Sequence, residues 1–216
     1  MANNTRNVLY IGANGKVGQL TLPRLKDAGL TTTAVVRNRD YERVLKKLGA
    51  GDVVIRDITE QSSEDWARLF EGYDCVIWSA GNGGRSGPEV TTAVDRDGEL
   101  RVIEALDTMD EPPFYLTIGY YRWDRMTSEA DPATNSWAAY VDAKRAVGKR
   151  LSKASFDHTI LAPAKLTVRP SRGGRHISND SDIEDATTSR ELVADTLVEH
   201  VLKPKQTSGT YAFIDA

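Results

Sequence analysis

The feature that most constrains the fold is a run of glycines that follows the first apolar segment of the chain. Residues 7–11 (NVLYI) lead into Gly12, Gly15 and Gly18, and a helical pattern begins at once. The first glycine allows a sharp turn off a strand, and the second lets backbone N–H groups approach a pyrophosphate. The third lets the helix pack closely, with its positive end toward the phosphates. Such a turn predicts a dinucleotide site formed by Gly12, Asn14, Gly15, Lys16, Val17 and Gly18.

Strand-like and helical segments alternate along the rest of the chain. Short apolar runs predict strands at 7–11, 31–36, 52–55, 75–79, 114–118, 158–161 and 210–214. Amphipathic stretches predict helices at 16–28, 41–48, 64–71, 90–107, 137–155 and 190–202. Strands that alternate with helices form parallel sheets covered on both faces and joined by right-handed crossovers. We therefore expect an α/β fold with a doubly wound parallel sheet of Rossmann type.

Two polar stretches, residues 119–136 and 167–188, interrupt this alternation. Each follows a late strand, at the edge of the sheet where such folds bind their ligands. We expect both to be substrate-side loops, and the alternative is that they are surface insertions without a role in binding. At 216 residues the chain is long enough for one such domain and too short for two, so a single Rossmann domain is expected over residues 1–216.

The composition argues against several classes of partner. A net charge of −3 gives no reason to expect binding to nucleic acid or to a membrane surface. Cys75 lies in an apolar run, so we expect its side chain to be part of the core. The N-terminal residues MANNTRN lack the apolar stretch of a signal peptide, so we expect a cytoplasmic protein. His158, His176 and His200 lie far apart, without neighbours at metal-ligand spacing, and no metal site is expected.

The end of the second predicted strand bears on the choice of nucleotide. NAD-binding domains usually carry Asp or Glu there, which accepts hydrogen bonds from the ribose 2′-hydroxyl. This chain has Arg37, with Arg39 two residues on. A guanidinium binds a phosphate through paired charge-assisted hydrogen bonds, whereas a carboxylate would repel it. The sequence therefore favours NADP over NAD, and the alternative is a solvated arginine at a strand end.

The third and fourth predicted strands end in residues that fit the same ligand. Asp57, followed by Ile58, is placed to accept a hydrogen bond from an adenine amino group. Ala80 and Gly81 are small enough for the ligand to lie close to the backbone. We include these four residues among the cofactor contacts, although each also fits an ordinary turn.

Tyr140 and Lys144 stand four residues apart in the helical stretch AAYVDAKRAV, on one face of the helix. A nearby ammonium, together with a nicotinamide cation, favours the phenolate form of a tyrosine and makes it a better proton shuttle. The lysine can also hydrogen-bond the nicotinamide ribose, so Lys144 is both a catalytic and a cofactor-binding candidate. The alternative is an exposed helical pair without function.

With these residues on one chain, the sequence resembles the short-chain dehydrogenase/reductase superfamily, and in particular its atypical branch of NAD(P)H-binding, NmrA-like proteins. The resemblance rests on the segments GANGKVG, VVRN, RDITE, VDRDGELRVIEAL, YVDAKRAVGKRL, FDHTILAPAKLT and SRELVADTLVEHVL. It implies that the glycine run holds the pyrophosphate, Arg37 the 2′-phosphate and Asp57 the adenine. It also implies that Tyr140 and Lys144 are the catalytic pair.

The sequence departs from this family on the substrate side. Relatives often carry serine at the end of the fifth strand, where this chain has Thr117, which we expect to hydrogen-bond the substrate oxygen. Relatives also commonly read Arg-Pro-Gly after the sixth strand, where this chain reads Ala162-Pro163-Ala164 and lacks the cation. Both changes alter the surroundings of the expected substrate.

Together these patterns predict an NADP(H)-dependent oxidoreductase that passes a hydride to a small carbonyl, quinone or flavin-like substrate. Four aromatic residues would either line a pocket for a flat substrate or pin a long loop: Tyr120, Tyr121, Trp123 and Trp137. One alternative is an NADP(H)-binding redox sensor without turnover. Another is a sugar-nucleotide epimerase or dehydratase. Such an enzyme needs a larger C-terminal substrate lobe than the roughly 50 residues after the sixth strand would form. We expect a monomer or a homodimer.

Overall fold

The computed structural model describes residues 6–83 and 85–216, so residues 1–5 of the N-terminal stretch considered for a signal peptide lie outside the described residues. The strands are β1 (Asn7–Ile11), β2 (Thr31–Val36), β3 (Asp52–Ile55), β4 (Cys75–Trp78), β5 (Phe114–Ile118), β6 (His158–Pro163), β7 (Lys165–Thr167), β8 (Gly174–Ile177), β9 (Thr187–Ser189) and β10 (Gly209–Asp215). The α-helices are α1 (Lys16–Asp27), α2 (Glu42–Leu48), α3 (Ser63–Phe70), α4 (Pro88–Thr91), α5 (Glu99–Asp107), α6 (Ser136–Leu151) and α7 (Arg190–Leu202). A 3-10 turn, η1 (Arg39–Tyr41), precedes α2, and a π-helical segment, η2 (Thr92–Gly98), joins α4 to α5.

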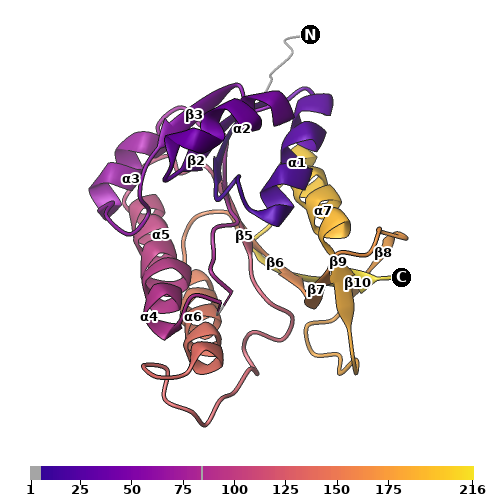
Figure 1. Cartoon of the computed structure of the whole chain (residues 1–216). Helices are drawn as coiled ribbons and strands as arrows, with labels where there is room; N and C mark the ends of the chain where they lie inside the picture. The colour runs from indigo at the N-terminus through magenta and orange to yellow at the C-terminus, as the bar shows by residue number, and fades with distance from the viewer. Residues whose placement is uncertain (1–5, 84) are drawn as a thin grey trace.

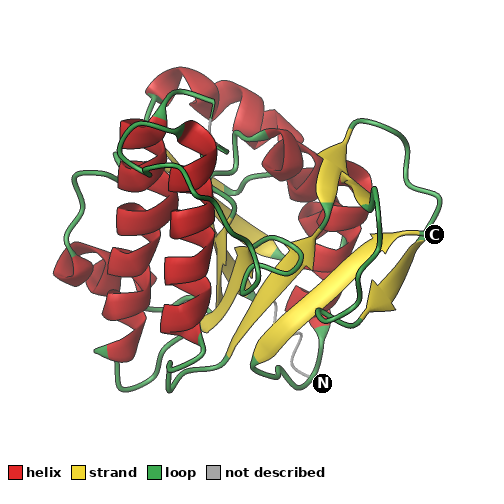
Figure 2. Ribbon diagram, turned by 90° about the horizontal axis from the view of Figure 1, so that it is seen from below, coloured by secondary structure: helices red, strands yellow, loops and turns green. Residues whose placement is uncertain are grey.

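Eight strands form one sheet in the order β3-β2-β1-β4-β5-β6-β10-β8 (Figure 1). Neighbouring strands run parallel except for β8, which is antiparallel to β10. The chain first builds outward from β1 to β3 and then crosses to β4 on the other side of β1, which places the topological switch point between β1 and β4. Helices cover both faces of the sheet (Figure 2). The predicted doubly wound sheet of Rossmann type is confirmed.

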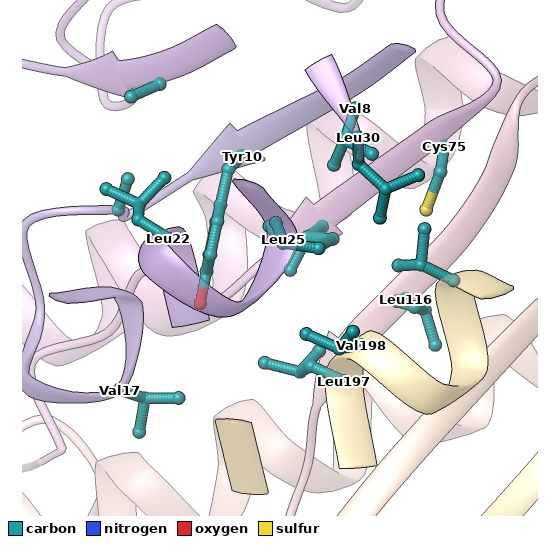
Figure 3. Close-up of a cluster of buried hydrophobic side chains, with 14 of the residues drawn as sticks. Val8, Tyr10, Val17, Leu22, Leu25, Leu30, Cys75, Leu116, Leu197 and Val198 are labelled. Atoms are coloured by element: carbon teal, nitrogen blue, oxygen red, sulfur yellow. The ribbon is translucent and has the colours of Figure 1, made fainter. Parts of the chain in front are cut away.

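The two-residue period of the strands divides the core between the two faces of the sheet. In β1, Val8 and Tyr10 belong to the face covered by α1, α2 and α7, where Leu25 of α1 joins them (Figure 3). Leu9 and Ile11 belong to the opposite face, covered by α3, α5 and α6. Because both faces are covered, the central strands are apolar throughout rather than alternating, as their burial shows.

One predicted helix is divided. The sequence predicts a continuous helix over 90–107, but the chain forms α4, then η2 with its wider turns, and then α5. A π-helical segment contains an extra residue per turn, which the apolar periodicity over such a short stretch does not reveal. Asp95 of η2 and Glu99 at the start of α5 are both buried. Segments of this kind often occur at functional sites.

The expectation that residues 167–188 form only a loop is wrong. β8 extends the main sheet beside β10, and β9 pairs with β7 in a separate two-stranded sheet. These strands are three or four residues long, and three of the four residues of β8 are exposed. Their backbone hydrogen bonds hold them in place, so no apolar alternation marks them in the sequence. Residues 119–135, by contrast, form turns and irregular chain, as predicted.

Candidate functional site

A cavity of about 620 Å³ opens at the carboxyl ends of β1 to β4. Open α/β sheets bind their ligands at this edge, beside the switch point, because the helices leave the sheet toward opposite faces there. Eight of the predicted cofactor contacts line the cavity: Gly12, Asn14, Gly15, Arg37, Asp57, Ile58, Ala80 and Gly81. The topology therefore brings together residues from four separate strand ends, as the sequence predicted.

The glycine turn after β1 has a closed side and an open side. Gly12 has a left-handed backbone (φ +87°), and a Cβ there would overlap the backbone nitrogen of Ala80. A Cβ on Gly18 would overlap the carbonyl oxygen of Ala13 in the turn itself. Gly15, in contrast, has φ −65°, and a Cβ would meet only the carbonyl oxygen of Gly12, at 3.2 Å. Gly15 therefore leaves space on the cavity side, while the other two glycines permit close packing of the backbone.

The first turn of α1 begins at the wall of this cavity. Gly15 is the N-cap, and among the described residues no side chain caps the helix. The first turn contains no acidic residue, and Lys16 is exposed. The first backbone N–H groups of a helix lack partners within the helix, so an uncapped start attracts an anion. Lys16, Val17 and Gly18 do not line the cavity, and a role for them in cofactor binding stays a prediction that concerns their backbone.

At the ends of β2 and β3, two arginines and a carboxylate line the cavity. Arg37 and Arg56 are both exposed and line the cavity beside Asp57. Asp57 accepts hydrogen bonds from the backbone nitrogen and hydroxyl of Thr59, at 2.9 and 2.7 Å. These bonds, with a smaller effect of Arg37, lower the pKa of the Asp57 carboxyl. Sequence reasoning missed Arg56, although it follows β3 directly and so reaches the same edge as Arg37.

The loop after β4 is fixed by a residue that the sequence analysis did not single out. Asp95 of η2 accepts hydrogen bonds from the backbone nitrogens of Asn82, at 2.7 Å, and Gly83, at 3.3 Å. Its carboxylate lies so close to Gly81 that a Cβ there would approach within 2.9 Å. Asp95 therefore fixes the loop that continues from Ala80 and Gly81, both of which line the cavity.

Tyr140 and Lys144 lie one turn apart on α6, which packs against α4 and η2. The Lys144 ammonium donates a hydrogen bond of 2.9 Å to the carbonyl oxygen of Ile118, at the end of β5. It lies 5.7 Å from the centre of the Tyr140 ring. Neither side chain lines the cavity, whose nearest walls are α4 and η2. The structure thus brings the predicted pair together beside these walls rather than inside the cavity.

The two side chains affect each other's protonation. Burial raises the pKa of the Tyr140 phenol above its ordinary value, and the opposing effect of Lys144 does not cancel this. Burial alone would lower the pKa of Lys144, but Tyr140 in its ionised form and the carboxylates of Glu99 and Asp95 outweigh it and leave the pKa raised. At neutral pH the pair is therefore a phenol beside an ammonium, which is the state of a proton donor.

Thr117 does not present a free hydroxyl to a substrate. Its side chain is 1 % exposed, and the hydroxyl donates a 2.5 Å hydrogen bond to Glu99. The predicted contact between Thr117 and a substrate oxygen therefore has no support in this geometry. Glu99, which the sequence analysis did not consider, is fully buried and also accepts a hydrogen bond from Tyr115, at 3.1 Å.

The four aromatic residues near the pair divide into two groups. Tyr121 is buried and donates to the carbonyl of Ser181, and Trp123 packs where a Cβ on Gly148 would overlap its ring. Both pin the 119–136 segment. Tyr120 lies edge-on to Tyr140, with ring centres 6.1 Å apart.

Trp137 is the fourth of these residues, and its ring centre lies 5.8 Å from that of Tyr140. Its side chain is 52 % exposed, unlike the buried Tyr121. The Tyr140 ring therefore has aromatic neighbours in both Tyr120 and Trp137, and the second of these is exposed.

Two other features bear on the predictions. Cys75 is buried, and burial raises the pKa of its thiol, as expected of a core residue. In the described part of the chain, no three His, Cys, Asp or Glu side chains gather as metal ligands would. Within the same residues, no helix is both long and apolar enough to cross a membrane.

The fold and the cavity are those of a nucleotide-binding Rossmann protein, and comparison with known proteins narrows this class. Residues 12–204 match a family described as NAD(P)H-binding. The chain belongs to the NAD(P)H-binding family. "UPF0659 protein YMR090W" from Saccharomyces cerevisiae is 30% identical over 207 residues, covering 93% of this chain and 88% of that protein. "Uncharacterized sugar epimerase YhfK" from Bacillus subtilis is 30% identical over 192 residues, covering 88% and 86%.

Solved structures show the same architecture. A putative NAD-dependent epimerase/dehydratase from Bacillus halodurans has a TM-score of 0.84 at 26% identity, over 98% of this chain and 94% of that chain. The oxidoreductase ylbE from Lactococcus lactis has a TM-score of 0.77 at 20% identity, over 97% and 91%. The predicted membership in an NAD(P)H-binding family is confirmed, and it supports a nicotinamide cofactor. The names of these proteins include both epimerases and an oxidoreductase.

Proposed function

We propose that the protein is an NADP(H)-dependent oxidoreductase of the short-chain dehydrogenase/reductase type, which passes a hydride to a small carbonyl, quinone or flavin-like substrate. One observation carries the proposal. The cavity combines an uncapped helix start at Gly15 with the exposed guanidinium groups of Arg37 and Arg56 at its other end. A dinucleotide with an added 2′-phosphate carries negative charge at both of these places.

The residues present fit such a cofactor. Gly15 leaves the space that a pyrophosphate requires, and a side chain there would fill it. Asp57 uses one oxygen toward Thr59, and its second oxygen can accept a hydrogen bond from an adenine amino group. Arg37 lines the cavity with an exposed guanidinium, which can form paired charge-assisted hydrogen bonds with a phosphate.

The chemistry of the chain's own residues suits reduction. NADPH supplies a hydride when it is bound. Tyr140 would donate its phenol proton to the substrate oxygen that receives negative charge, and the adjacent Lys144 ammonium would stabilise the phenolate that remains. Lys144 is tied to Ile118 through one hydrogen bond and has two further N–H groups that could reach a ribose. In this proposal Thr117 does not bind the substrate. It helps to position Tyr140 and Lys144, because it lies next to Ile118, which accepts the hydrogen bond of Lys144.

The relative named as a sugar epimerase supports a second candidate, an epimerase that keeps its cofactor through the reaction. The fold favours the reductase. After β6, the chain adds β8 and β10 to the main sheet, and α7 covers one of its faces. This arrangement leaves only the β7–β9 pair and short loops for a substrate lobe. Net oxidation of NADPH by a carbonyl, quinone or flavin acceptor would favour the reductase, and interconversion of sugar epimers without it would favour the epimerase.

Replacing Arg37 tests the cofactor. Arg37→Ala should weaken NADPH binding by roughly 1–3 kcal/mol, the scale of charge-assisted hydrogen bonds, and leave NADH binding nearly unchanged. Fluorescence titration with both nucleotides measures this. Arg39→Ala is the matched control, because Arg39 lies outside the cavity and pairs with Glu42 at 3.8 Å. Equal losses for NADPH and NADH in Arg37→Ala would contradict the assignment to NADP.

Replacing Tyr140 tests the chemistry. Tyr140→Phe removes one hydroxyl and keeps the ring between Tyr120 and Trp137. Turnover should fall by roughly two to four orders of magnitude, the contribution of a positioned general acid, while NADPH affinity stays close to normal. Hydride transfer that continues undiminished in this variant would remove Tyr140 from the mechanism. Normal NADPH binding with no turnover of any substrate would instead indicate a redox sensor.

A further inference from the structure

Four side chains that can ionise lie close to one another, three of them buried and Tyr140 half-buried, and the proposed function uses only two of them. Tyr140 and Lys144 come from α6, Asp95 from η2 and Glu99 from the first turn of α5. Both η2 and α5 pack against α6 (Figure 1). A buried carboxylate is unfavourable unless hydrogen bonds or an opposite charge compensate it.

The two carboxylates are compensated differently. Asp95 receives backbone hydrogen bonds from the loop after β4, so its contacts account for its position. Glu99 is fully buried, and its Oε1 accepts hydrogen bonds from Tyr115 and Thr117. Its Oε2 meets no hydrogen-bond partner within the described residues. Hydrogen bonds alone therefore do not account for a charged group at Glu99.

Contacts along β5 connect Glu99 to the predicted catalytic pair. Tyr115 and Thr117 are two residues apart in β5 and so lie on the same face of the strand. The carboxylate of Glu99 therefore accepts hydrogen bonds from both hydroxyls. The next residue, Ile118, accepts the hydrogen bond of the Lys144 ammonium through its carbonyl oxygen. The position of this strand end determines where the lysine is held, one helical turn from Tyr140.

We infer that Glu99 is a positioning residue for the Tyr140–Lys144 pair, which holds the end of β5 and places a negative charge beside the buried ammonium. The inference rests on the proposed function in assigning Glu99 to that pair. Glu99 does not touch the cavity, so its action passes through Thr117, Ile118 and the electric field rather than through a substrate.

The charges around Glu99 agree with this role. Burial raises the pKa of Glu99 to about 7, while Lys144 and the hydroxyls of Thr117 and Tyr115 act to lower it. Asp95, on the neighbouring η2, adds a smaller raising effect. In return, the negative charge of Glu99 acts to raise the pKa of both Lys144 and Tyr140. Removing that charge should therefore lower both pKa values.

Glu99→Gln tests the inference, because glutamine keeps the shape of the side chain and removes its charge. The ionisation of Tyr140 is followed by tyrosinate absorbance in the cofactor-free protein, as the difference between each protein and its Tyr140→Phe counterpart. Glu99→Gln should move the Tyr140 midpoint to lower pH. Glu104→Gln, on the exposed side of the same helix, should leave it unchanged. A midpoint that stays in place in Glu99→Gln overturns the inference.

A reciprocal measurement covers the case in which Glu99→Gln does not fold. The carboxyl group of Glu99 is titrated by carbon-13 NMR in the wild-type protein and in Lys144→Met. Loss of the positive charge should move the ionisation of Glu99 to higher pH, because Lys144 lowers the pKa of Glu99 in the wild-type protein. An unchanged Glu99 titration in Lys144→Met contradicts the inference.

Turnover separates this inference from the proposed function. With an active substrate, Glu99→Gln should shift the alkaline limb of the kcat profile to lower pH, since both groups of the pair lose their protons earlier. If the Tyr140 midpoint shifts but none of the acceptors tested supports NADPH oxidation by the wild-type protein, the coupling stands and the proposed reaction fails. If turnover is found and neither titration shifts, the reaction stands and the role of Glu99 fails.

Discussion

At the scale of single residues, the glycines of the β1–α1 turn serve different purposes that their regular spacing conceals. Gly12 combines a left-handed backbone with contact against the main chain of Ala80. Gly18 is enclosed by the carbonyl of Ala13. Gly15 has an ordinary backbone conformation and faces the cavity. Two of the three glycines are therefore required by the fold, and the third faces the cavity, where we propose that it makes room for the ligand.

A pair of valine substitutions separates these requirements. Gly15→Val should fold with near-normal stability and lose NADPH binding, because the branched side chain occupies the space for the pyrophosphate. Gly18→Val should lower the free energy of unfolding by roughly 1–3 kcal/mol, the usual cost of forcing extra atoms into a packed region. Urea unfolding and NADPH titration of both variants measure the two effects. Normal NADPH affinity in Gly15→Val would place the phosphate site elsewhere.

Residue identity allowed part of the site to be predicted. Arg37 and Asp57 could be placed because each follows a clear strand, and parallel strands end at one edge. Asp95 and Glu99 could not, since a carboxylate in a helical pattern usually indicates an exposed face. Their burial depends on η2 and on hydroxyl groups of β5 that lie far away in the sequence.

At the scale of elements, two segments without strong sequence signals are tied to each other. Arg122 pairs with Asp182, and Arg125 pairs with Asp180. Asn179 accepts a hydrogen bond from the backbone nitrogen of Arg122, at 2.9 Å, and donates one of 2.8 Å to Asp124.

Long apolar strands were predictable because burial on both faces leaves a clear pattern. The short strands β7, β8 and β9 were not, because their partners, rather than their side chains, define them. The contact between the 119–136 segment and residues 178–182 could not be predicted either, because it depends on polar groups that are far apart in the sequence.

Asn179→Ala should loosen this contact without unfolding the protein. It removes both hydrogen bonds at once, and the half-buried location limits the loss of global stability to about 1–2 kcal/mol. Limited proteolysis should cut residues 119–136 faster than in the wild-type protein, because local opening becomes more frequent. Arg125→Ala, which removes one exposed ion pair worth about 0–1 kcal/mol, is the control and should change the rate less. Equal cleavage rates in all three proteins would contradict the expectation.

At the scale of the whole molecule, one sheet supplies both halves of the core. β1 contributes side chains to both faces, so neither layer of helices can detach without exposing the same strand. This arrangement favours cooperative unfolding of the described chain as one unit. The cavity opens at the carboxyl ends of β1 to β4 in that unit, so a ligand bound there stabilises all of it.

Thermal unfolding should therefore show one transition that rises with NADPH. At a free concentration of about 100 times Kd, NADPH should add about 2.7 kcal/mol to the free energy of unfolding. Calorimetry with and without NADPH, and with NADH at the same concentration, gives the comparison, and NADH should raise the midpoint less. Two separate transitions, or equal effects of both nucleotides, would contradict this expectation.

The two ends of the cavity differ in how freely they can change over evolutionary time. The turn at Gly12 is enclosed by main chain, so a substitution there alters the architecture itself. Arg37 and Arg56 are exposed side chains on which no part of the core depends. If these two arginines select the coenzyme, as proposed, a lineage that inherits this scaffold can exchange one coenzyme preference for another by single surface substitutions. Descendants of one ancestor can then draw electrons from different nucleotide pools while their folding remains the same.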